Sequence, residues 1–66
     1  MSQIAILSIE DEPEVRAAIR RDLRVFEDKF RIEAAEDIAD AREAIRMIEE
    51  GGDVLGLILC DHRLPG

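Results

Sequence analysis

Acidic residues that could bind a cation follow two separate apolar runs of this 66-residue chain. Glu10 and Asp11 come directly after the apolar run 4–9. Asp61 comes directly after the second run, 54–60. If the runs are neighbouring parallel strands, their carboxyl ends meet at one edge of the sheet, where α/β proteins bind ligands. Two carboxylates about 5 Å apart repel by roughly 3 kcal/mol at an effective dielectric near 20, and a divalent cation reverses the sign of that interaction.

Oxygen ligands of this kind select a hard ion, so the pattern predicts Mg²⁺, with Mn²⁺ as an alternative. A solvated turn at the start of a helix is the simpler interpretation of the first acidic group, since carboxylates favour a helix N-terminus. For Asp61 the simpler interpretation is turn formation before Leu64-Pro65-Gly66. The two groups together, at the ends of two runs, favour a shared site.

Three strands are expected to position these acids. The runs 4–9 and 54–60 are too short for stable helices, and their continuous apolar character is typical of strands buried on both faces. Residues 30–34 alternate apolar and polar side chains, which predicts a half-exposed edge strand.

Two helices are expected between the strands. Pro13 suits the first turn of a helix of about four turns. Asp37 can cap a second helix that ends at Gly51-Gly52, because glycine accepts the backbone angles that follow a helix. Apolar residues recur at three- and four-residue spacing in both helices: Val15, Ala18, Ile19, Leu23 and Phe26 in the first, and Ile38, Ala41, Ala44, Ile45 and Ile48 in the second.

The predicted order of elements is β-α-β-α-β. Alternation of strands and helices implies the α/β class, with a parallel sheet and right-handed crossovers. If the first and third strands pair, Asp11 and Asp61 meet at one edge although 50 positions separate them.

This arrangement resembles the receiver domain of two-component response regulators. The matching motifs are EDEP at 10–13 and LILCD at 57–61, followed by RLPG at 63–66. The resemblance covers about the N-terminal half of the family's domain. It therefore implies a truncated receiver domain over residues 1–66: a partial flavodoxin-like three-layer sandwich with strands in the order 2-1-3 of a complete 2-1-3-4-5.

The resemblance also implies roles for individual residues. Asp61 would be the phospho-acceptor that takes a phosphoryl group from a histidine kinase or phosphotransfer protein. Glu10, Asp11, Asp61 and the backbone carbonyl of Arg63 would hold Mg²⁺. His62 is expected to be an exposed loop residue without a catalytic role. The chain would be a signalling module in a phosphorelay, not an enzyme.

Several residues of the family's site have no counterpart in this sequence. Receivers bind the phosphoryl group with a Ser or Thr and a Lys from later strands, and they carry an aromatic switch residue. Lys29 is the only lysine here, and it is expected to lie far from the acidic edge. We therefore expect an acceptor and a metal site without the half of the domain that reads the signal.

Two other classes of function compete with this one. A phosphohydrolase with an Asp nucleophile usually carries a second carboxylate two residues later, but Arg63 occupies that position. The other alternative is a non-signalling fragment that folds only as a dimer or higher oligomer. In the family's strand order the third strand would be left as an exposed edge, so we expect association through this edge.

The composition of the chain limits the cellular compartments and the binding partners that are compatible with it. Sixteen acidic against nine basic residues give a net charge of −7, which opposes binding to nucleic acid or anionic membranes. No signal peptide is visible, and the longest apolar stretches fall far short of the roughly 20 residues needed to span a bilayer. Cys60, the only cysteine, is expected to be a small buried hydrophobe in a reducing compartment, with a reactive or metal-binding thiol as the alternative. The prediction is a cytoplasmic protein.

The arginines between 16 and 24 suggest a solvated helix face or a kinase-docking face.

Overall fold

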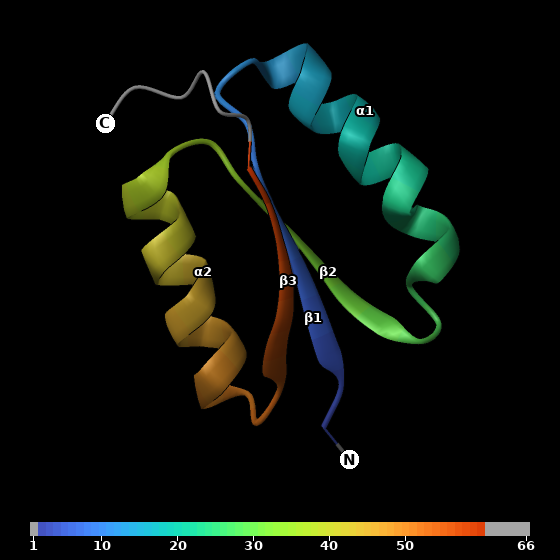
Figure 1. The fold of residues 1–66 in the computed structure, drawn as a ribbon, viewed down its shortest axis with the longest axis vertical. Helices are drawn as coiled ribbons and strands as arrows, with labels where there is room; N and C mark the ends of the chain where they lie inside the picture. The colour runs from blue at the N-terminus through green and yellow to red at the C-terminus, as the bar shows by residue number, and fades with distance from the viewer. Residues whose placement is uncertain (1, 61–66) are drawn as a thin grey trace.

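A computed structural model describes residues 2–60 as three strands, two α-helices and one turn of 3₁₀ helix (Figure 1). The order of elements is the predicted β-α-β-α-β. The bounds are β1 Ile4–Ile9, α1 Pro13–Leu23, the 3₁₀ turn η1 Arg24–Phe26, β2 Phe30–Ala35, α2 Ile38–Glu50 and β3 Val54–Cys60.

The strands form one parallel sheet in the order β2-β1-β3, which confirms the predicted fold class. Helix α1 lies on one side of the sheet and α2 on the other, so the molecule has three layers (Figure 1). Strand β1 is central: Ile9 pairs with Ala35 of β2 and with Cys60 of β3. The arrangement matches part of a flavodoxin-like sandwich.

The core lies between β1 and α2. All residues of β1 from Ala5 to Ile9 are buried, as expected for a strand covered on both faces. A core cluster joins residues from all three strands and α2: Leu7, Ile9, Ala35 and Ala41, with Ala44, Ile45 and Leu55 packed against them. Ser8 is also buried, and among residues 2–60 its hydroxyl has no hydrogen-bond partner. Five of the ten buried residues within 2–60 therefore belong to the central strand.

Helix α1 begins at Pro13, as predicted, and packs less closely than α2. None of its residues is buried, although the 3₁₀ turn extends it to nearly the predicted length. The rings of Phe26 and Phe30 meet edge to face, 6.4 Å apart, where this segment passes into β2.

The ends of α2 also follow the prediction. Asp37 caps the helix, because its Oδ1 accepts a hydrogen bond of 2.7 Å from the backbone N–H of Asp40. The helix ends at Gly51, and Gly52 has a φ of +82°, a conformation that glycine adopts without steric cost.

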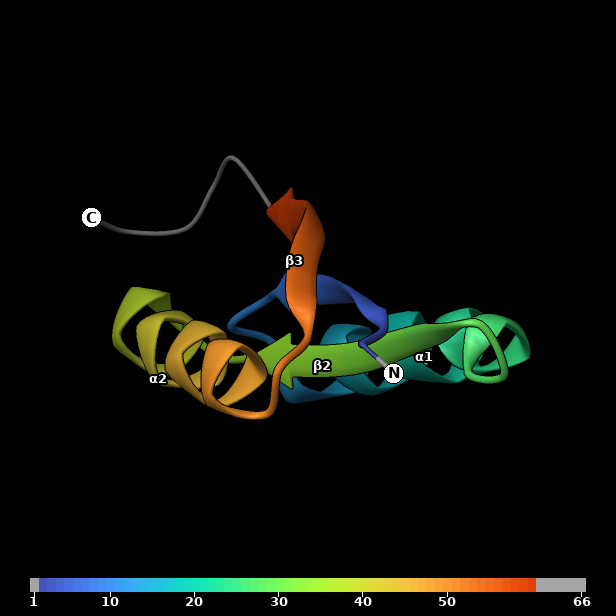
Figure 2. The same ribbon diagram turned by 90° about the horizontal axis from the view of Figure 1, so that it is seen from below.

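Strand β3 departs from the prediction of a strand buried on both faces. Val54, Leu57, Ile58 and Leu59 are 39–58% exposed, and Cys60 is exposed as well, so the prediction of a buried cysteine is wrong. The cause is the position of the strand: α1 contacts β1 and β2 but not β3, and although Leu55 packs against the core cluster, most of β3 projects away from the helices (Figure 2).

An ion-pair network joins the start of β3 to β2 and to the N-terminal segment. The guanidinium of Arg31 bonds Glu33 at 2.8 Å and Asp53 at 3.1 Å. The other carboxylate oxygen of Asp53 accepts a hydrogen bond of 2.7 Å from the backbone N–H of Gln3. These contacts tie β3 to its neighbours at one end of the sheet. The acidic turn, residues 10–12 after β1, lies at the other end.

Candidate functional site

Glu10 is the buried member of the acidic turn that follows β1, with 2% of its surface exposed. Its backbone N–H donates to the carbonyl of Ala35 at 3.0 Å, which continues the pairing of β1 with β2 by one residue. Its Oε2 accepts a hydrogen bond of 3.1 Å from the backbone N–H of Asp11. The carboxylate is therefore held against the end of the strand, and the simple interpretation of a solvated turn does not fit this residue.

Arg16 fixes the same turn from the first turns of α1. Its side-chain Nη1 donates to the backbone carbonyl of Glu10 at 3.0 Å. Its backbone N–H donates to the carbonyl of Glu12 at 2.8 Å, which is the first bond of the helix. Sequence reasoning missed this role and treated Arg16 as part of a solvated or docking face. The sequence did contain a signal for this role: of the three arginines of α1, Arg16 is the nearest in sequence to the end of β1.

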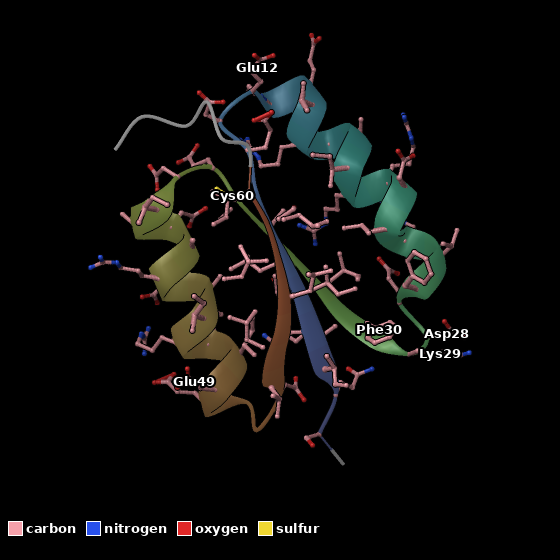
Figure 3. All side chains as sticks on the ribbon, in the orientation of Figure 1. Glu12, Asp28, Lys29, Phe30, Glu49 and Cys60 are labelled. Carbon is pink, nitrogen blue, oxygen red and sulfur yellow. The ribbon has the colours of Figure 1, made fainter. Side chains whose placement is uncertain are left out.

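Asp11 and Glu12 are exposed, so a solvated turn remains consistent with these two side chains. Glu12 lies at the start of α1, while Lys29 lies at the other end of the molecule (Figure 3). The expectation that Lys29 is remote from the acidic turn is confirmed.

The structure places the carboxyl ends of β1 and β3 side by side, as the proposed site requires. Ile9 pairs with Cys60, so β1 and β3 end side by side at the edge that carries Glu10 and Asp11. Asp61, His62 and Arg63, on which the predicted acceptor and the remaining metal ligands fall, lie outside the described residues.

The acidic residues after β1 have the oxygen donors that part of a hard-cation site needs. Glu10 and Asp11 offer two carboxylates at one strand end, and the buried Glu10 is an oxygen donor whose turn is already ordered. Within residues 2–60 no group of three or more His, Cys, Asp or Glu residues could hold a metal ion. The predicted metal site is therefore not complete within residues 2–60, and its remaining ligands fall outside the described residues.

Comparisons with known proteins assign no family to the chain. No protein-family model, no curated protein and no solved structure matches it. None of the helices within residues 2–60 is both long enough and apolar enough to cross a membrane.

Proposed function

We propose that the chain is a phospho-acceptor module of the receiver type, in which Asp61 takes a phosphoryl group from a histidine kinase or phosphotransfer protein. The pairing of Ile9 with Cys60 is the observation that supports this proposal. Glu10 and Asp61 are the residues that follow this pair in the sequence, and parallel strands end at a common edge.

In this proposal Asp61 is the nucleophile. One of its carboxylate oxygens forms a bond to phosphorus as the bond between phosphorus and the donor's histidine nitrogen breaks. Glu10, Asp11, Asp61 and the carbonyl of Arg63 would hold Mg²⁺, which when bound neutralises charge on the phosphoryl oxygens. The bond from Arg16 to the carbonyl of Glu10 keeps the acidic turn in place without occupying a carboxylate oxygen.

Phosphorylation by acetyl phosphate and binding of beryllofluoride test the proposal on the full 66-residue chain. The chain has no Trp or Tyr, so intact mass and two-dimensional NMR are better readouts than intrinsic fluorescence. We expect the mass of one phosphoryl group to be added, and beryllofluoride to shift the amide signals of residues 10–12, both only with Mg²⁺. Asp61→Asn removes both responses, and Asp11→Asn raises the Mg²⁺ concentration they require.

Asp28→Asn is the matched control, because Asp28 is exposed and lies at the opposite end of the molecule (Figure 3). It leaves both responses unchanged. Labelling that persists in Asp61→Asn, or that needs no divalent cation, would contradict the proposal. A kinase-dependent role of this kind belongs to the cytoplasm.

The exposed strand β3 favours a second candidate, a non-signalling fragment that is completed by assembly. Four large apolar side chains of β3 are exposed, as expected for a strand that another chain covers. This candidate predicts association without any response to phosphoryl donors. The mass and NMR experiment therefore separates the two.

A further inference from the structure

The two edges of the sheet carry different side chains. On the β2 edge, Arg31 and Glu33 form an ion pair. On the β3 edge, no residue from Val54 to Cys60 is charged. Charged side chains protect natural edge strands from pairing with further strands. The composition of β3 is therefore that of an interior strand, although within residues 2–60 it pairs only with β1.

Both faces of β3 are also apolar. Leu57 pairs with Ile6, and Ile58 pairs with Leu7. Leu7 belongs to the core cluster with Ala41 of α2, so Ile58 lies on the face of the sheet toward α2. Leu57 lies on the opposite face, because side chains alternate along a strand. Strands of parallel sheets that are apolar on both faces are normally covered on both sides and paired at both edges.

We propose that β3 pairs antiparallel with β3 of a second copy of this chain, about a two-fold axis, to give a continuous six-stranded sheet. This inference does not depend on the phospho-acceptor function; it gives a partner and a geometry to the assembly through β3 named above, and it holds whether or not the chain accepts a phosphoryl group. A two-fold interface sets a surface against itself, so it requires a surface that is complementary to its own copy. An uncharged apolar strand meets this requirement, whereas the chain as a whole, with a net charge of −7, would repel its copy over most other surfaces.

The charge next to β3 is compatible with this pairing. Asp53 directly precedes the strand, and its carboxylate is neutralised by Arg31 at 3.1 Å. Antiparallel pairing also separates the Asp53 residues of the two copies, because each lies opposite the far end of the other β3. Parallel pairing would bring the two carboxylates together and could not close about a two-fold axis.

The pleat of β3 restricts the register to pairings centred on a residue, and we place the centre at Ile58, inside the regular part of the strand. The pairing with β1 shifts between Ala5 and Ile6, so Gly56 is an extra residue and the regular part of the strand is 57–60. Residues on the same face must lie opposite one another. Pairing centred on Ile58 sets this side chain against Ile58 of the partner subunit, and sets Leu57 against Leu59 of the partner subunit. Three apolar cross-strand pairs result.

Cysteine cross-linking tests both the interface and its register. In a Cys60→Ser background, Ile58→Cys is expected to give a disulfide-linked dimer rapidly under mild oxidation, and Leu57→Cys to do so more slowly. Val25→Cys is the matched control, because Val25 is 75% exposed in η1, outside the proposed interface. Equal cross-linking of the Val25→Cys and Ile58→Cys chains would overturn the proposal.

Sedimentation velocity supplies a second, independent measurement. The wild-type chain is expected to sediment as a dimer, and Ile58→Lys as a monomer, because the new charge would face its own copy across the axis. Ile58 is already 44% exposed in the single chain, so far-UV circular dichroism should show that Ile58→Lys keeps its secondary structure. A monomeric wild-type chain, or open-ended oligomers without a dimer, would contradict the two-fold pairing.

Discussion

At the scale of single residues, the acidic turn is ordered by bonds to its backbone. The N–H of Glu10 bonds Ala35, its carbonyl accepts from Arg16, and its Oε2 accepts from the N–H of Asp11. Buried polar groups are costly unless they are hydrogen-bonded, and Glu10 is 2% exposed. The turn can therefore present carboxylates at the strand end without first being ordered by a cation.

Replacement of Arg16 by Met tests this interpretation. The substitution keeps an unbranched apolar side chain but removes the bond to the carbonyl of Glu10. We expect the free energy of unfolding to fall by about 1 kcal/mol, as for a hydrogen bond from a charged donor that is partly solvated. Urea unfolding followed by circular dichroism measures the change. Arg20→Met, at an exposed position of the same helix, is the control, and an equal loss there would contradict a specific role for Arg16.

At the scale of elements, the strands are held at their two ends by different chemistry. The acidic turn lies at the carboxyl ends of the strands, while the amino end of β3 is tied by Asp53 to Arg31 and Gln3. The pKa of the Asp53 carboxyl lies below its ordinary value, because it accepts hydrogen bonds from the Gln3 N–H and from Arg31. This end of the sheet is therefore sensitive to acid.

The sign of the pH dependence follows from the lowered pKa. Ionised Asp53 favours the folded state, so its stabilising contribution is complete above the unfolded-state pKa of about 3.9 and is lost as the pH falls through the lower folded-state pKa. Asp53→Asn keeps an oxygen for the Gln3 N–H but removes the charge. We expect the variant to be less stable than the wild type at neutral pH, and the difference to vanish in strong acid.

Urea unfolding at several pH values between about 5 and 2 measures this convergence. Asp28→Asn controls for the loss of one exposed carboxylate. If the difference in the free energy of unfolding between Asp53→Asn and the wild type stays constant across this range, the ionised carboxylate of Asp53 is not what stabilises the folded state.

The accuracy of prediction from sequence differed between local and long-range features. Pro13, Asp37 and Gly51 mark helix ends through contacts within a few residues, so their roles could be read from the sequence. The exposure of β3 and of Cys60 could not, because apolar composition does not show whether a helix lies over the strand.

In the candidate site too, some features could be predicted from the sequence and others could not. The position of Glu10 and Asp11 at a strand end next to β3 was predictable from the alternation of strands and helices. The bond from Arg16 to Glu10 was not, because it depends on the path of the turn between β1 and α1. The role of Asp61 stays a prediction, since the residue lies outside the described part of the chain.

At the scale of the whole molecule, a small core supports a sheet in which, over the described residues 2–60, most of β3 is exposed. A folded unit of about 60 residues, the size of the described part of the chain, buries only about 60% of the surface that it exposes when unfolded, so on its own it is marginally stable. Pairing of β3 with a second copy would add buried surface where the single chain has least. Stability and association should then be linked.

Thermal unfolding at different protein concentrations tests this link. For a chain that unfolds from a dimer, a tenfold increase in concentration stabilises the folded state by about 1.4 kcal/mol of dimer, so the Tm rises with concentration. We expect this rise in the wild type and a constant Tm in Ile58→Lys, followed by circular dichroism. A wild-type Tm that does not depend on concentration would contradict the link.

The central position of β1 also has a consequence for how the chain folds. Strand β1 leaves the ribosome before the two strands that pair with it, and Ile4 lies opposite Val54, 50 residues later. Closing so long a loop costs chain entropy before its contacts can compensate, which slows folding. During synthesis, β1 has one neighbour once residue 35 has emerged, but it cannot gain the second before residue 54. We therefore expect a nascent chain to keep one side of its central strand open to chaperones until the last residues of β3 leave the exit tunnel.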